Sequence, residues 1–153
     1  MADQPVMLIT GASSGIGAET ARAAAKQGYR LVLAARSEDK LKGLQQELGG
    51  EETVLTVQCD VQSGDDQKNM VDQALKTFGR IDAVFANAGR GGEPGGFSGA
   101  DPDVWKDMIL TNIYGVGLTL QHCMPALKES KGHLLLTGSA AGRATIPGSM
   151  YSA

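Results

Sequence analysis

Residues Val6-Met7-Leu8-Ile9-Thr10 run directly into Gly11-Ala12-Ser13-Ser14-Gly15-Ile16-Gly17. The apolar run predicts a buried strand, and the glycines after it predict a tight turn that leads into a helix. Glycine lets a ligand approach the main chain closely. The first N–H groups of a helix have no partner within the helix and carry a partial positive charge, which suits a phosphate. This segment therefore predicts a strand, a phosphate-binding loop and a helix, and indicates a dinucleotide ligand.

The glycine spacing narrows the choice of nucleotide. It reads G-x-x-x-G-x-G, which differs from the common G-x-G-x-x-G. A P-loop would carry Lys-Ser or Lys-Thr after its last glycine, and Ile16-Gly17-Ala18 supplies neither. The pattern therefore disfavours an enzyme that acts on nucleoside triphosphates.

Composition sets the broad class of protein. The 153 residues are 42% hydrophobic and 20% charged, with a formal net charge of −3. This length predicts one domain, residues 1–153, and the absence of a basic excess disfavours nucleic-acid binding. The sequence has no apolar run of the about 20 residues that a membrane helix needs and no opening signal segment. We therefore expect no membrane partner and a cytoplasmic location.

Cysteine and histidine give no sign of a metal centre. Cys59 and Cys123 lie too far apart in sequence for a metal or dithiol motif, and we expect both to be buried thiols. His122 and His133 have no acidic residue at the spacing of a zinc protease. We therefore assign no metal site.

The order of apolar and helical segments predicts the fold. Five short apolar runs suit buried parallel strands: residues 6–9, 31–35, 54–57, 81–86 and 134–137. Segments with helical period lie between them, with apolar faces made by Leu41, Leu44 and Leu48; by Met70, Val71, Ala74, Leu75 and Phe78; and by Trp105, Met108, Ile109, Ile113, Val116 and Leu120. This alternation predicts an α/β fold, a Rossmann-like doubly wound parallel sheet with right-handed crossovers.

Ligands of such sheets bind at the carboxyl ends of the strands, near the point where strand order reverses. In the usual order the first and fourth strands are neighbours, which places residues 11–17 beside Asn87-Ala88-Gly89. Residues 89–99, with six glycines, favour a flexible connection over the site rather than a second phosphate loop. Asp101 and Pro102 then predict a helix start, with the aspartate as its cap.

Three polar residues are candidates for chemistry, and each has a structural alternative. Asn112 lies on an apolar helix stripe, so it either ties the helix to neighbouring backbone or holds a water; its spacing alone favours the structural role. Ser139 either caps a turn or donates a hydrogen bond to a carbonyl oxygen. Tyr151 either packs on a surface or exchanges a proton with that oxygen.

Together these segments resemble the short-chain dehydrogenase/reductase family, over the whole chain. Residues 10–17 resemble its cofactor motif, and Asn87-Ala88-Gly89 resembles its strand-four motif. Asn112, Ser139 and Tyr151 are similar to its catalytic positions.

The resemblance implies a role for each of these residues. Tyr151 is the acid/base, Ser139 steadies the substrate oxygen and Asn112 holds a water in a proton relay, which reverses the structural preference above. Asp60 binds the adenine amino group and Val61 lines the ring. The implied cofactor-binding set is completed by Gly11, Ser13, Ser14, Gly15, Ile16, Gly17, Asn87, Ala88 and Gly89.

The end of the second predicted strand indicates which cofactor is bound. A carboxylate there binds the ribose hydroxyls of NAD and repels a 2′-phosphate, but this chain has Ala35 followed by Arg36. A guanidinium can grip phosphate with two parallel hydrogen bonds. We therefore predict NADP over NAD; the alternative is that Arg36 only stacks on adenine.

The resemblance also predicts a segment beyond residue 153. In the family a lysine follows the tyrosine four residues later and lowers the tyrosine pKa; it would fall at position 155. The last strands and helices of the family's fold come after that lysine. We expect the polypeptide to continue, the sheet of residues 1–153 to stop after its fifth strand with an uncovered apolar edge, and the 153-residue chain alone to be inactive.

The predicted function is hydride transfer between NADP(H) and a small carbonyl or secondary alcohol, in a homo-oligomer. The alternative is an incomplete dinucleotide-binding protein that acts as a sensor or structural partner.

Overall fold

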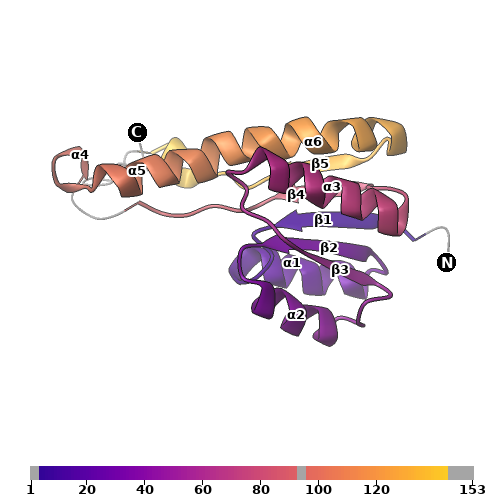
Figure 1. The fold of residues 1–153 in the computed structure, drawn as a ribbon. Coiled ribbons are helices and arrows are strands. Elements are labelled where there is room, and N and C mark those ends of the chain that lie inside the picture. Colours follow the sequence, from indigo (N-terminus) through magenta and orange to yellow (C-terminus); the bar gives the residue numbers. More distant parts are fainter. Residues whose placement is uncertain (1–3, 93–95, 145–153) are drawn as a thin grey trace.

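The computed structural model describes residues 4–92 and 96–144, which form a parallel sheet with helices on both faces (Figure 1). The sheet order is β3-β2-β1-β4-β5. Its strands are β1 (Val6–Thr10), β2 (Arg30–Ala35), β3 (Val54–Gln58), β4 (Ala83–Ala86) and β5 (His133–Leu136). The helices are α1 (Gly15–Lys26), α2 (Glu38–Glu47), α3 (Gly64–Phe78), α4 (Gly96–Gly99), α5 (Pro102–Ile109) and α6 (Gly115–Ser130), with a π-helix η1 (Leu110–Tyr114) and a 3₁₀ helix η2 (Ala140–Gly142). The predicted doubly wound fold is confirmed.

The core consists of two apolar layers, one on each face of the sheet. Alternate residues of β1 point to opposite faces, as the pleat requires: Val6 and Leu8 pack with α3 and α6, and Met7 and Ile9 pack with α1 and α2. β1 lies between β2 and β4, with Met7 opposite Ala83. The predicted pairing of the first and fourth strands is therefore confirmed, and it brings the two glycine-containing turns together.

Two of the α-helices, α3 and α5, begin with a side-chain cap. Ser63 accepts a hydrogen bond from the Asp66 N–H at the start of α3, and Asp101 accepts one from the Asp103 N–H at the start of α5. Pro102 is the first residue of α5, as predicted. These caps stabilise the helix ends without any ligand.

The predicted apolar face on residues 105–120 is wrong in its phase. Met108 is buried, but Trp105 is 41% exposed and Ile113 is 68% exposed. The prediction assumed one unbroken helical period, whereas the π-helix η1 interrupts it and rotates the residues after it. α6 instead buries Thr119, which hydrogen-bonds to Gln67 of α3, and Cys123, which packs in the core.

The fifth predicted strand is present, but it is not buried. β5 pairs with β4 and is the edge strand of the described sheet, and Leu135 and Leu136 are each about half exposed. The expected uncovered apolar edge is therefore present in the described residues. Among these residues no helix is both long enough and apolar enough to span a bilayer.

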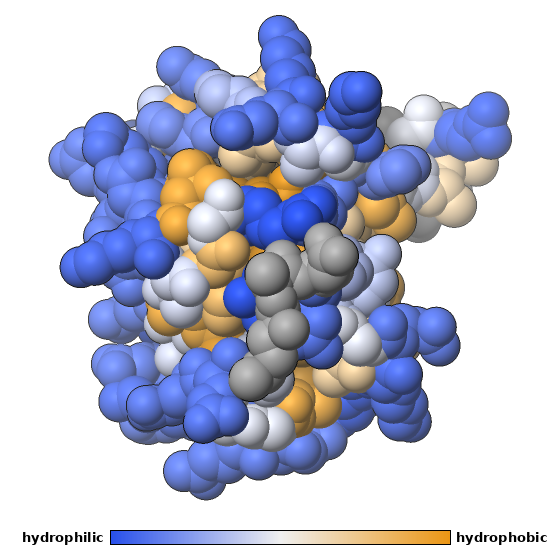
Figure 2. Space-filling model, turned by 90° about the vertical axis from the view of Figure 1, so that its right-hand side faces the viewer, coloured by the Kyte–Doolittle hydropathy of each residue, from blue (hydrophilic) through white to orange (hydrophobic). Residues whose placement is uncertain are grey.

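The two ends of the sheet differ in character. Figure 2 views the end where the strands begin and shows apolar surface at its centre, surrounded by hydrophilic side chains. The strands run from this end toward the end where α4 and α5 lie in Figure 1. The polar groups described below gather at that second, carboxyl end.

Asp82 joins the starts of three strands. Its side chain accepts hydrogen bonds from the Val6 N–H at 2.8 Å and from Arg80 at 2.6 Å, and its carbonyl accepts one from the His133 N–H. Burial alone raises the pKa of Asp82, but the hydrogen bonds from Arg80 and Val6 outweigh burial and hold the pKa below its ordinary value of 3.8. The charged form is therefore the one that stabilises the fold.

We expect Asp82→Asn to lower the free energy of unfolding at pH 7 by about 1–3 kcal/mol, because charged hydrogen bonds at a partly buried site are lost. The pKa of Asp82 is lower in the folded than in the unfolded state. The difference in free energy of unfolding between wild type and variant is therefore fully present above the pKa of the unfolded state, and it shrinks as the pH falls below about 4. Urea unfolding of wild type and variant at pH 7 and pH 3 measures the difference at neutral pH and its decrease at acidic pH. A difference that stays constant between these pH values would contradict the assigned ionisation.

Candidate functional site

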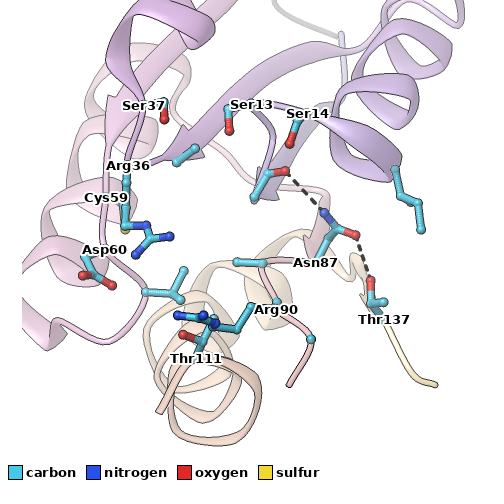
Figure 3. Close-up of a pocket in the computed structure, with 17 residues that line it drawn as sticks. Ser13, Ser14, Arg36, Ser37, Cys59, Asp60, Asn87, Arg90, Thr111 and Thr137 are labelled. Carbon is cyan, nitrogen blue, oxygen red and sulfur yellow. Dashed lines mark hydrogen bonds between the residues drawn. The ribbon is translucent and has the colours of Figure 1, made fainter. Parts of the chain in front are cut away.

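A pocket of about 500 Å³ lies at the carboxyl ends of the strands (Figure 3). It is formed by the loop after β1, the ends of β2, β3 and β4, the turn after β5, and one residue of η1. The predicted cofactor-binding residues that line it are Gly11, Ser13, Ser14, Ile16, Arg36, Asp60, Val61, Asn87, Ala88 and Gly89. The structure thus brings most of the predicted set to one concave surface, whose volume is in the usual range for ligand sites.

The glycines of the first loop have different structural roles. Gly11 and Gly15 have φ of +65° and +54°, a left-handed conformation that favours glycine. A Cβ on Gly17 would lie 2.3 Å from the Gly11 carbonyl oxygen, whereas a Cβ on Gly15 would meet nothing within 4 Å. Glycine at position 17 therefore allows the start of α1 to pack closely against the loop backbone, whereas the space beside Gly15 is open.

Two helices that begin at the pocket lack the caps found on α3 and α5. Neither Ser14 before α1 nor Ser37 before α2 makes a side-chain cap hydrogen bond, and both residues line the pocket. The first N–H groups of these helices therefore have no side-chain cap and lie beside open space. The start of α1, which has no acidic residue in its first turn, fits an anionic group such as the phosphate of a dinucleotide, whereas α2 already carries Glu38 and Asp39 in its first turn.

A hydrogen-bond network fixes the turns that follow β1 and β4. Thr10 is 1% exposed, and its Oγ1 accepts hydrogen bonds from the Asn87 N–H at 3.0 Å and the Ala88 N–H at 3.1 Å. The Asn87 amide donates to the carbonyls of Thr10 and Gly11, and its Oδ1 accepts from Thr137 at 3.0 Å (Figure 3). Asn87 thus connects three strand ends and keeps the pocket floor rigid.

The sequence pattern placed Thr10 in the cofactor motif without giving it a role of its own, and sequence reasoning missed Thr137 as part of the site. Each is a hydroxyl-bearing residue at or directly after the carboxyl end of an apolar strand. A polar side chain at that point has to find a partner when the strand end is buried, and this signal was available in the sequence.

The ends of β2 and β3 form the opposite side of the pocket. The Arg36 carbonyl accepts a hydrogen bond from Gln58 at 3.1 Å, and its side chain extends into the pocket (Figure 3). Asp60 accepts a hydrogen bond from the Gln62 N–H at 3.0 Å, so its carboxylate is held by its own turn. Val61 is 8% exposed and packs against Gly115, where a Cβ would lie 2.9 Å away.

A second polar network that the sequence did not predict lies beside η1. The Gln62 side-chain N–H donates to Asp107 at 2.6 Å and to Thr111 at 2.9 Å, and the Arg90 guanidinium pairs with the other Asp107 oxygen. The hydrogen bond from Gln62, followed by that from Arg90, lowers the pKa of Asp107 below its ordinary value. The carboxylate therefore stays charged and holds both donors. Arg90 and Thr111 line the pocket.

The predicted catalytic residues are not all placed in the pocket. The Asn112 side chain accepts from the Arg90 N–H at 2.9 Å and donates to the Arg90 carbonyl at 2.8 Å, so the structure shows the backbone tie, the first of the two alternatives. Ser139 accepts from the Ala141 N–H at 3.1 Å and begins η2, which is the turn-capping alternative. Tyr151 lies outside the described residues. The roles of these residues in catalysis stay predictions.

Both cysteines are buried, as predicted. Burial raises the pKa of the Cys59 thiol and that of the Cys123 thiol, each to about 12. Both therefore remain protonated near neutral pH and are poor nucleophiles. Within residues 4–92 and 96–144 no three His, Cys, Asp or Glu side chains are grouped so as to hold a metal ion.

Comparison with known proteins finds relatives that share this fold. A family model described as short chain dehydrogenase matches residues 5–153. The short chain aldehyde dehydrogenase 1 of Euphorbia lathyris is 37% identical over 145 residues, which cover 94% of this chain and 50% of that protein. The chain spans about half the length of the curated relatives it matches.

Solved structures match over nearly the whole chain as well. An alcohol dehydrogenase from Thermococcus sibiricus, complexed with 5-hydroxy-NADP, has a TM-score of 0.91 and 35% identity, with coverage of 98% of this chain and 65% of that one. A short chain dehydrogenase/reductase from Burkholderia phymatum, in complex with NAD, has a TM-score of 0.91 and 31% identity, with coverage of 98% and 54%. Similar structures therefore hold either nicotinamide dinucleotide.

Proposed function

The chain belongs to the short chain dehydrogenase family, and from this premise we propose that it is the cofactor-binding part of an oxidoreductase that transfers hydride between NADP(H) and a carbonyl or secondary alcohol. The proposal rests mainly on one observation: α1 and α2, which both begin without a side-chain cap, start at the same pocket that the Arg36 side chain lines. The start of α1 has no acidic residue in its first turn, and it and the Arg36 guanidinium each favour an anion, as the pyrophosphate and the 2′-phosphate of NADP provide.

The proposed roles follow from the chemistry of the residues in the pocket. Ser13, Ser14 and the N–H groups at the start of α1 bind the pyrophosphate, and Asp60 with Val61 binds the adenine. Asn87 keeps the floor rigid beneath the ribose. When bound, the nicotinamide supplies or accepts the hydride. Tyr151 exchanges the proton, Ser139 steadies the substrate oxygen and Asn112 supports the relay, in a homo-oligomer that we expect in the cytoplasm.

The preference for NADP rests on the end of β2. Ala35 offers no carboxylate to ribose hydroxyls, and Arg36 extends into the pocket next to Ser37 at the start of α2. No ion pair or side-chain hydrogen bond involves the Arg36 guanidinium within the described part of the chain. An unpaired guanidinium beside an uncapped helix start attracts a 2′-phosphate rather than a bare hydroxyl.

We expect Arg36→Ala to weaken NADP⁺ binding by about 10- to 100-fold, the value of one lost charged hydrogen-bond pair, and to change NAD⁺ binding by less than about twofold. Calorimetric titration with each dinucleotide measures this. Arg22→Ala is the matched control, because Arg22 pairs with Glu19 and Glu47 outside the pocket. Equal weakening of both dinucleotides would show that Arg36 contacts adenine instead.

Binding and turnover separate the proposed function from its alternative. The protein is titrated with NADPH and then assayed for NADPH oxidation on a panel of ketones and aldehydes. Oxidation that depends on the carbonyl compound supports the oxidoreductase. Tight binding without oxidation by any preparation of the protein favours the sensor or structural role, and absence of dinucleotide binding overturns both.

A further inference from the structure

Arg90 is held in the pocket at both its main chain and its side-chain head. Its N–H and carbonyl are both hydrogen-bonded to the Asn112 side chain, at 2.9 and 2.8 Å. Its guanidinium pairs with Asp107, whose other oxygen accepts from Gln62 at 2.6 Å. An arginine normally loses much rotamer entropy when it binds a ligand. In this pocket the surrounding groups have already fixed the side chain, which lowers that loss.

The fixed guanidinium lies on the same side of the pocket as Arg36. Figure 3 shows the side chains of Arg36, from the end of β2, and Arg90, from the turn after β4, extending toward the side where Asp60 and Thr111 lie. Asn87 and Thr137 lie on the other side. The charge of Arg36 also contributes, after the closer groups, to lowering the pKa of Asp107. The two guanidinium groups therefore approach one region of the pocket.

Arg36 and Arg90 both keep N–H donors that are available to an anion in this region. Asp107 balances Arg90, and Asp60 is turned to the N–H of its own turn, while Arg36 has no acidic partner within residues 4–92 and 96–144. Arg90 uses one end of its guanidinium on Asp107 and keeps further N–H donors. Two guanidinium groups with spare donors suit a phosphate dianion better than a neutral hydroxyl.

We propose that Arg90 is a second specificity-determining arginine for the 2′-phosphate of NADP, with Asp107 and Gln62 as the positioning residues that hold it. This inference rests on the proposed function, because it needs an adenosine half bound in the pocket. Arg36 approaches the phosphate from the end of β2. Arg90 approaches it from the turn after β4, so the preference depends on two strand ends rather than one.

The test compares two ligands that differ only in the 2′-phosphate, adenosine 2′,5′-bisphosphate and adenosine 5′-monophosphate, by calorimetry. Wild type is expected to prefer the bisphosphate. Arg90→Met should weaken bisphosphate binding by about tenfold, which corresponds to the loss of one charged hydrogen bond. Monophosphate binding should stay within about twofold of wild type. Arg90→Lys, which keeps the charge without the planar fork, should restore part of the preference.

Asp107→Asn tests the positioning role. It keeps the side-chain size but loses the carboxylate, so the bisphosphate-to-monophosphate preference should fall by about three- to fivefold. A purely structural role for the ion pair would weaken both ligands equally or neither. Arg22→Met, outside the pocket, should leave the preference as in wild type.

The outcomes distinguish this inference from the proposed function. A wild-type protein that prefers the bisphosphate, together with an Arg90→Met variant that keeps the full preference, overturns only the role of Arg90. Equal losses for both ligands in Arg90→Met also overturn it, because Arg90 then contacts the adenine. Wild-type protein that binds neither adenosine nucleotide overturns the proposed function, and this inference with it.

Discussion

Gly17→Ala is expected to weaken dinucleotide binding by about 100-fold or more and to lower the free energy of unfolding by about 1–3 kcal/mol. The added Cβ would lie 2.3 Å from the Gly11 carbonyl oxygen and 2.8 Å from Asn87 Nδ2. Neither group can move freely, because the first is backbone and the second is hydrogen-bonded to Thr10 and Gly11. The loop must shift, and the N–H groups at the start of α1 shift with it.

Gly43→Ala is the matched control for this prediction. Gly43 also lies in a helix, α2, but a Cβ there would meet nothing within 4 Å. Alanine is a better helix former than glycine by about 1 kcal/mol, so this variant should be slightly more stable than wild type. Urea unfolding and NADPH titration of both variants give the comparison. If Gly17→Ala behaves like Gly43→Ala, the close packing of the loop is not needed for binding.

Tyr151→Phe is expected to lower kcat by about 10²- to 10⁴-fold, the usual contribution of a general acid. The ring is kept and only the hydroxyl is removed, so NADPH affinity should stay within about twofold of wild type. A free tyrosine titrates near pH 10, and its proton transfer therefore needs help from neighbouring positive charge. Steady-state assays on a carbonyl substrate, with NADPH titration alongside, measure both quantities.

Tyr114→Phe provides the control for the loss of a tyrosine hydroxyl. Tyr114 ends η1, is 51% exposed and does not line the pocket. We expect this variant to have wild-type kcat. Unchanged turnover in Tyr151→Phe would remove Tyr151 from the reaction and leave the proton donor unassigned.

Much of the fold could be predicted because it depends on short-range patterns. The apolar runs and the glycine loop depend on residues near one another in sequence, and β1 to β4 formed within three residues of their predicted ends. Arg36, Asp60 and Asn87 line one pocket, in agreement with the rule that ligands bind at the carboxyl ends of parallel strands. These predictions hold because parallel strands with helical crossovers have few possible arrangements.

The errors arose where the outcome depends on contacts between distant segments. The π-helix adds one residue to a turn and so changes the phase of Ile113 and of the residues after it, which a single helical period does not predict. The hydrogen bonds of Asn112 go to Arg90, which is 22 residues away. Neither result is encoded in a local period.

The order of strands and helices, the glycine loop and the chemistry of the strand ends follow from local periodicity and backbone freedom, so the amino-acid sequence was enough to predict them. Which polar groups become partners depends on the tertiary structure. It paired Arg90 with Asp107 and Gln62 with Thr111, and it left the starts of α1 and α2 without caps at a common pocket. The physical reason is that side-chain hydrogen bonds depend on distances of about 3 Å between atoms, and folding alone brings residues so far apart in sequence to that distance.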